Sequence, residues 1–221
     1  MKPQALDLFC GAGGATRGLQ MAGFHVTGVD INPQPRYVGD RFVRANALAP
    51  PFDLGAFDFI WASPPCQAFT PLRNLTRRKY ANIIPPVRSL LRDAGVLWVI
   101  ENVTGAPLGE SGYLVTLCGT MFGLATRDGS AEVRRHRLFE TNFSVGLQPA
   151  CQHDGTRRSL TITGHTPQIN VVRNRIRKTF PRSEAGAAVG IDWMSMKGLS
   201  QAIPPAYAEF IGREALKCLR R

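Results

Sequence analysis

Residues 57–67 limit the fold of this chain more than any other stretch of its sequence. The four consecutive apolar residues 59–62 are typical of a strand buried on both faces of a parallel sheet. Pro64 and Pro65 end this strand, because proline donates no hydrogen bond to a neighbouring strand. Cys66 is therefore expected at the end of a central strand. In open α/β sheets, ligands bind at that edge.

Cys66 allows two interpretations at this point. Most free cysteines are small buried hydrophobic residues. A cysteine held by a rigid turn at a ligand-binding edge is instead a candidate nucleophile. The Pro-Pro-Cys-Gln segment alone does not choose between them.

Strand-like and helix-like segments alternate through the first half of the chain. Strands are expected at 5–9, 23–29, 41–47, 59–62 and 96–100, and helices at 15–22 and 84–94. This alternation predicts a doubly wound, mostly parallel, Rossmann-like α/β sheet. Further on, a strand is expected at 160–164 and a last helix at 206–219, with Pro205 in its first turn.

A glycine-rich loop, residues 10–14, joins the first strand to the first helix. Such a loop brings backbone N–H groups and a helix N-terminus against a nucleotide-like ligand. Asp30 ends the second strand, where an acid can hold a ribose. The alternative is that Asp30 caps the turn before Asn32 and Pro33. Loop and acid together favour an adenosine-containing cofactor, with Asn46 near its adenine.

The apolar run 96–100 ends in Glu101, Asn102 and Val103. It repeats the arrangement at Cys66, because a buried strand again delivers a polar group at its end. Both groups are expected at the same edge of the sheet.

The charge of the chain indicates a polyanionic partner. The net charge is +11 and the isoelectric point is near 10.1. Residues 64–92 contain six basic residues and no acid, and residues 131–182 contain ten basic residues and three acids. A solvated basic surface is the alternative, but two basic blocks, one beside Cys66, favour a groove that follows nucleic-acid phosphates. The predicted nucleic-acid contacts are Gln67, Arg73, Arg77, Arg78, Lys79, Arg173, Arg175, Arg177 and Lys178.

Composition excludes several other classes of protein. The hydrophobic fraction of 44% fits a globular chain, and no apolar run is long enough for a membrane span. The first residues lack the apolar core of a signal peptide, so none is expected. The five cysteines form no Cys-x-x-Cys pair, which favours a reducing cytoplasm. Cys118 is interpreted as a packing residue. Cys151 and His153 are two possible zinc ligands without a second pair, so no metal site is predicted.

Five motifs, in order, resemble those of the DNA cytosine-C5 methyltransferases. They are residues 7–14, Pro64-Pro65-Cys66-Gln67, Glu101-Asn102-Val103, Arg135-x-Arg137 and residues 202–206. The resemblance implies a class I methyltransferase fold that binds S-adenosylmethionine and releases S-adenosylhomocysteine. The cofactor contacts that it implies, together with the loop argument, are Phe9, Gly11, Ala12, Gly13, Gly14, Asp30, Ile31, Asn46, Pro65, Gln201 and Ala202.

The chain departs from the family pattern in four places. Val133 replaces a glutamine before the two arginines, and Ser200-Gln201 replaces a Gly-Asn pair. Asn46 stands where the family often has an acid. The target-recognition region is short. The expected division is a catalytic domain at 1–141, a small irregular recognition region at 142–190, and a C-terminal segment at 191–221 that returns to the catalytic domain.

The resemblance also implies a mechanism. The Cys66 thiolate attacks C6 of a cytosine flipped out of the duplex, and basic surroundings are expected to lower the pKa of the thiol. Glu101 contacts N3 and the exocyclic amine, Arg137 contacts O2, and Arg135 supports the catalytic loop or a phosphate.

The expected partner is double-stranded DNA, bound by a monomer in a bacterial or phage-infected cytoplasm. The compact size is similar to phage or solitary enzymes, and a restriction endonuclease partner is left open. Two alternatives remain: a tRNA cytosine-C5 methyltransferase, and an inactive DNA-binding relative.

Overall fold

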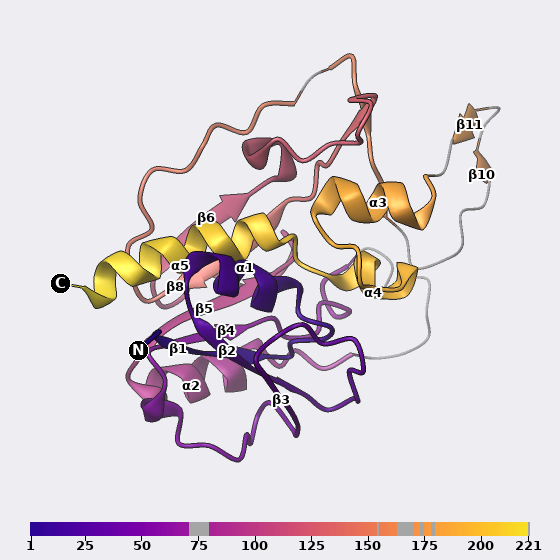
Figure 1. Cartoon of the computed structure of the whole chain (residues 1–221). Helices are drawn as coiled ribbons and strands as arrows, with labels where there is room; N and C mark the ends of the chain where they lie inside the picture. The colour runs from indigo at the N-terminus through magenta and orange to yellow at the C-terminus, as the bar shows by residue number, and fades with distance from the viewer. Residues whose placement is uncertain (71–79, 154, 163–169, 173–174, 178–179, 221) are drawn as a thin grey trace.

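A single sheet forms the centre of the computed structural model, which describes residues 1–70, 80–153, 155–162, 170–172, 175–177 and 180–220. Within this part of the chain the sheet has seven strands in the order β3-β2-β1-β4-β5-β8-β6 (Figure 1). Their bounds are β1 (Gln4–Leu8), β2 (His25–Asp30), β3 (Arg41–Arg44), β4 (Phe59–Ala62), β5 (Leu97–Asn102), β6 (Tyr113–Leu117) and β8 (Arg137–Thr141). The first five strands are parallel, and β8 runs antiparallel to both of its neighbours. The predicted doubly wound, mostly parallel sheet is confirmed.

Helices cover both faces of this sheet (Figure 1). α1 (Gly14–Ala22) and α5 (Pro205–Leu219) lie on one face, and α2 (Ile84–Ala94) lies on the other. The side chains of β4 alternate between the two layers: Phe59 and Trp61 pack with α1 and α5, whereas Ile60 and Ala62 pack with α2. This alternation explains why the strand is apolar at every position.

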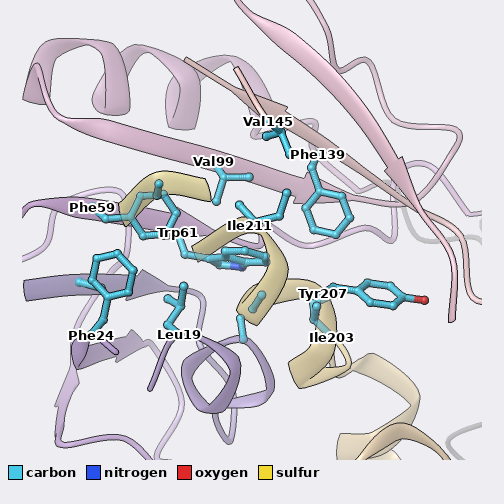
Figure 2. Close-up of a cluster of buried hydrophobic side chains, with 14 of the residues drawn as sticks. Leu19, Phe24, Phe59, Trp61, Val99, Phe139, Val145, Ile203, Tyr207 and Ile211 are labelled. Carbon is cyan, nitrogen blue, oxygen red and sulfur yellow. The ribbon is translucent and has the colours of Figure 1, made fainter. Parts of the chain in front are cut away.

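Aromatic rings fill the core between the sheet and α5, as Figure 2 shows. The Trp61 ring meets Phe139 edge-on at 5.7 Å, and Phe139 in turn lies 6.2 Å from Tyr207 of α5. Tyr207 and Ile211 are fully buried. The C-terminal helix is therefore an integral part of the sheet's packing.

Two glycines let the C-terminal segment approach α1 closely. A Cβ atom built on Gly18 would lie 2.1 Å from the carbonyl oxygen of Pro205, and one on Gly14 would lie 2.5 Å from the carbonyl oxygen of Ile203. A larger residue at either position would require the backbone to move. The start of α5 is thus placed directly against the glycine-rich loop.

A buried ion pair joins α2 to β8. Arg88 donates to both carboxylate oxygens of Glu140 at 2.8 Å, and both side chains are almost fully buried. Burial alone would raise the pKa of Glu140, but hydrogen bonds from Arg88, Gly109 and Ser111 hold it at about 2. Arg88 was counted in the basic block beside Cys66. Because its charge is paired with Glu140 inside the fold, Arg88 is not available to a nucleic-acid phosphate. The expectation that the whole basic block 64–92 forms a phosphate-binding groove is therefore wrong for this residue.

The second half of the chain contains regular elements that were not predicted. α3 (Arg182–Val189) lies inside the region expected to be irregular, and α4 (Met196–Gln201) follows it. Short elements complete the described structure: η1 (Leu54–Ala56), η3 (Gly119–Phe122), β7 (Ala131–Glu132), β9 (Arg158–Ser159), β10 (Asn170–Val172) and β11 (Arg175–Arg177). The strand expected at 160–164 is not formed over 160–162: β9 ends at Ser159, and Leu160 packs in a core cluster with α3 and α4. Residues 163–164 lie outside the described part of the chain.

Among the described residues, no helix combines the length and the apolar character needed to span a membrane.

Replacing Gly18 with alanine tests the packing of α1 on α5. The added methyl group would overlap the Pro205 carbonyl, so we expect the free energy of unfolding to fall by about 1–3 kcal/mol. Urea denaturation of the variant and the wild type measures this change. Gly155→Ala is the control, because its Cβ would have no neighbour within 4 Å. Equal unfolding midpoints for Gly18→Ala and the control would contradict the packing argument.

Candidate active site

A cavity of about 700 Å³ lies at the carboxyl ends of the parallel strands. Its walls come from the loop after β1, the ends of β2 and β3, the turn after β4 and the end of β5. α4 and the residues before α5 close it from the C-terminal side. The cavity is therefore at the edge where the sequence placed both Cys66 and the glycine-rich loop.

The glycine-rich loop is held in an unusual backbone conformation. Phe9, Gly11 and Gly13 all have positive φ, at 62°, 50° and 88°. The N–H of Gly11 donates to Asp30 Oδ2 at 3.0 Å, and the N–H of Asn32 donates to Asp30 Oδ1 at 2.9 Å. Asp30 thus caps the turn, as the alternative interpretation held, while its side chain still lines the cavity. The two interpretations are compatible, because each carboxylate oxygen can accept more than one hydrogen bond.

Most of the predicted cofactor residues line this one cavity. They are Phe9, Gly11, Ala12, Gly14, Asp30, Ile31, Asn46, Pro65, Gln201 and Ala202. Gly13 does not line it; its Cβ position faces Val38, Thr16 and Tyr37 instead. Their role as ligand contacts stays a prediction.

Asn102 holds the turn that carries Cys66. Its buried side-chain amide donates to the Pro64 carbonyl at 2.9 Å, and the N–H of Ser63 donates to Leu8 at 3.1 Å. The turn after β4 is thereby fastened to β5 and β1. Asn102 lies at the edge expected from the sequence, but its structural role depends on a contact 38 residues away and has no local sequence signal.

The environment of Cys66 differs from the expectation. Burial raises the pKa of its thiol, the nearby Glu101 raises it further, and Arg137 and Arg135 lower it only in part. The predicted lowering by basic surroundings is therefore wrong for the protein without its ligands. The cost of removing the thiolate from water exceeds the attraction of the two guanidinium groups.

Glu101 is buried at the end of β5, beside Arg137. The Arg137 Nε atom lies 3.2 Å from Glu101 Oε1, and Ser63 hydrogen-bonds the carboxyl group. Burial nevertheless raises the pKa of Glu101, since the two arginines and Ser63 offset it only in part. Ser63 is itself oriented by Trp61, whose indole N–H donates to its hydroxyl at 2.8 Å.

The two predicted arginines have different surroundings. Arg137 lines the cavity, whereas Arg135 is not among its lining residues and donates from Nη2 to the Ser200 carbonyl at 2.6 Å. The Arg135 carbonyl accepts a hydrogen bond from Tyr207 at 2.6 Å, and burial lowers the pKa of its guanidinium to about 10. Arg135 therefore connects the segment before β8 to the C-terminal segment, and its expected support of the catalytic loop or of a phosphate stays a prediction.

Two departures from the family motifs now have structural explanations. Val133, in place of a glutamine, is buried in the cluster formed with α3 and α4. Ser200 contributes its backbone carbonyl to Arg135, and both Ser200 and Gln201 line the cavity.

Asp7 is a site residue that the sequence analysis did not select. It is fully buried in β1 and lines the cavity, and it accepts a hydrogen bond from Thr16 at 2.5 Å on Oδ2. Within the described part of the chain, its Oδ1 atom has no hydrogen-bond partner. Burial raises its pKa to about 7. The signal was visible as one acid within the otherwise apolar run 5–9.

The predicted nucleic-acid contacts are described only in part. Gln67 lines the cavity, and its buried Oε1 atom has no partner among the residues that the structure describes. Arg175 and Arg177 lie on β11, paired with β10, and their side chains are not described. Arg73, Arg77, Arg78, Lys79, Arg173 and Lys178 lie outside the described residues. The basic groove stays a prediction.

Replacing Asp7 with asparagine tests the buried acid. Because its pKa rises from 3.8 to about 7 on folding, the native state keeps a proton that the unfolded chain has released. The wild type should therefore lose stability as the pH rises from about 4 to 7, and the loss should be constant above that range. Across this window, the free energy of unfolding of the asparagine variant should rise relative to that of the wild type by up to ~4 kcal/mol.

Denaturant unfolding at several pH values measures this difference, and Asp93→Asn, at an exposed position, is the matched control. Parallel stability curves for Asp7→Asn and the wild type would contradict the assignment.

Comparisons with known proteins agree with the fold. A family model described as a methyltransferase domain matches residues 6–78. No curated protein matches the chain.

Three solved structures match almost the whole chain. An E. coli protein described as a DNA modification methyltransferase encoded within a prophage has a TM-score of 0.63 at 14% identity, over 99% of this chain and 100% of that one. The S. pombe Dnmt2 methyltransferase has a TM-score of 0.60 at 14% identity, and the Entamoeba histolytica methyltransferase EhMeth has 0.58 at 11%, both over 100% of each chain. This chain thus has the Rossmann-like fold of these methyltransferases.

Proposed function

We propose that this protein transfers a methyl group from S-adenosylmethionine to C5 of a cytosine in DNA, through a covalent bond to Cys66. The observation that carries the proposal is one continuous cavity, lined by the glycine-rich loop and Asp30 on one side and by Cys66, Glu101 and Arg137 on the other. A methyl donor and an acceptor base can therefore meet within it.

The cavity fits the chemical groups of the donor. S-adenosylmethionine carries an ammonium group, a ribose and an adenine, and when bound it supplies an activated methyl group. Asp7 Oδ1 is a buried acceptor without a partner in the described residues, suited to an ammonium. Asp30 retains lone pairs that can accept hydrogen bonds from the ribose hydroxyls. Asn46 lines the cavity just after β3 and can hydrogen-bond the adenine.

Cytosine C5 is a poor nucleophile until the ring's conjugation is broken. The Cys66 sulfur forms a bond to C6, and the electron pair of the C5–C6 double bond moves towards N3 and O2. Protonated Glu101 donates to N3, and Arg137 donates to O2. C5 is then enamine-like and takes the methyl group, after which a base removes the C5 proton. The C6–sulfur bond breaks and the proton on N3 returns to Glu101, which restores the ring, the thiolate and the acid.

The electrostatics of the site link Glu101 to Cys66. Glu101 raises the pKa of the Cys66 thiol, and Arg137 and Arg135 lower it. Once Glu101 holds a proton for N3, its negative charge no longer opposes the thiolate. The positive charges of the arginines then favour ionisation. Binding of cytosine would thus activate the nucleophile that the resting site keeps protonated.

DNA is the substrate that we favour. The net charge of +11 fits a polyanion, and one of the similar structures is described as a DNA modification methyltransferase. The target carbon is covered within a duplex stack, so the base must be flipped into the cavity. A tRNA cytosine is the second candidate, because the same motif set can serve a tRNA substrate.

Methylation in cells tests the reaction and its nucleophile together. The wild type and Cys66→Ala are expressed in a bacterial host that lacks cytosine methylation, and its DNA is analysed by bisulfite sequencing. We expect protected cytosines in one short context with the wild type and none with the variant, because the C6 adduct cannot form. Cys218→Ala, on α5 away from the cavity, is the control and should methylate normally.

Full protection by Cys66→Ala would contradict the covalent mechanism. If the purified protein methylates tRNA but not duplex DNA, the substrate is RNA and the proposal of DNA as the substrate is wrong.

Replacing Glu101 with glutamine should lower the rate of transfer by roughly 10²–10⁴-fold, because glutamine cannot deliver a proton to N3. Binding of S-adenosylmethionine, measured by calorimetry, should change little. Radiolabelled methyl transfer in single turnover measures the rate. A rate equal to that of the wild type would remove Glu101 from the mechanism.

A further inference from the structure

Four potential metal ligands converge outside the active-site cavity. The ligand atoms of Cys118, His136, Cys151 and His153 all lie within 4.8 Å of one another. We propose that these four side chains bind a zinc ion. Two thiolates and two imidazoles are a ligand set that zinc prefers, and four protein ligands complete a tetrahedral structural site.

The distances between the ligand atoms fit one ion. Cys151 Sγ lies 3.1 Å from His153 Nε2 and 3.5 Å from His136 Nε2, and Cys118 Sγ lies 3.3 Å from His153 Nε2. Tetrahedral zinc, with its usual bond lengths to sulfur and nitrogen, requires sulfur–nitrogen separations of about 3.5 Å. The side chains therefore surround a space of the correct size for the ion.

The surroundings support ligation by orienting the side chains. The Thr120 hydroxyl donates to Cys118 Sγ at 3.4 Å and lies 3.8 Å from Cys151 Sγ. The His136 ring also hydrogen-bonds the backbone of Arg134. Contacts of this kind fix the ligands of metal sites. Cys118 is buried and Cys151 is exposed, so the ion would have access from solvent on one side.

A disulfide between Cys118 and Cys151 is the competing explanation for the two sulfurs. It would leave unexplained why His153 directs the same ring nitrogen at both of them. It also gives no role to His136, whose ring stands at 79° to that of His153 with 5.1 Å between the centroids. Ligation of one ion accounts for all four side chains.

The site would join three separate segments. Cys118 directly follows β6, His136 directly precedes β8, and Cys151 and His153 lie in the region between β8 and β9. The described residues of that region form no helix or strand. Zinc would therefore connect this region to the ends of β6 and β8.

His136 also links the site to the active-site cavity, because it lies between Arg135 and Arg137. Ligation of His136 restrains the segment from which Arg137 reaches Glu101. This consequence for catalysis rests on the proposed function, whereas metal binding itself does not.

The experiment measures metal in the full-length protein, purified without a histidine tag and without chelators. Mass spectrometry of the metal content should find about one zinc per chain. Replacement by Co²⁺ should give the visible absorption of a tetrahedral, thiolate-bound ion. The double variant Cys151→Ser/His153→Ala should lose both signals, while Cys218→Ser/His25→Ala, which changes a cysteine and a histidine outside the cluster, should keep both.

Three results would overturn the proposal: a wild type that holds no zinc and gives no Co²⁺ spectrum, a double variant with unchanged metal content, or a Cys118–Cys151 disulfide in freshly isolated, metal-free protein. The Co²⁺ spectrum is measured on the wild type, so it remains decisive if the variant does not fold. Metal content is independent of methyl transfer, so failure of the proposed function would leave this result unaffected.

Discussion

The close approach of the C-terminal segment to α1 is the contact on which both the core and the cavity depend. Gly14 and Gly18 leave room for the backbone at Ile203 and Pro205, and α5 then packs Tyr207 against the sheet. The same segment carries Gln201 and Ala202 to the cavity wall. A chain end more than 180 residues from the glycine-rich loop thus becomes one wall of the ligand site, as the hydrogen bond from Trp193 to Ala12 also illustrates.

Burial sets the chemistry of the cavity more than net charge does. The chain carries an excess of positive charge, yet the pKa values of Asp7, Cys66 and Glu101 are all raised, because desolvation is the largest effect on each. Burial therefore shifts the protonation equilibrium of each group towards its neutral form. Such a site suits a reaction in which an acid must give a proton to a base and a thiol must ionise only when the base is present.

The segment between β7 and β8 connects the active site with the irregular part of the molecule. The Arg135 side chain donates a hydrogen bond to the Ser200 carbonyl, and the Arg135 carbonyl accepts one from Tyr207. Arg137 forms an ion pair with Glu101, and the ring of His136, between the two arginines, faces Cys151. Three successive side chains thus point to the C-terminal segment, the cavity and the proposed zinc site. A distortion of this segment would therefore displace side chains at all three places.

The five parallel strands of the sheet, and the edge at which the cavity lies, could be predicted from the sequence alone. The apolar run 59–62 and the helix 84–94 have the predicted bounds, because hydrophobic periodicity and flanking prolines are local signals. Since parallel strands end at one edge, it also followed that Cys66 and Glu101 would lie close together. Three features could be seen only in the folded chain: the ion pair of Arg88 with Glu140, the raised pKa of Cys66, and the meeting of Cys118 with His136, Cys151 and His153. These outcomes depend on desolvation and on contacts between distant segments, which no local pattern in the sequence records.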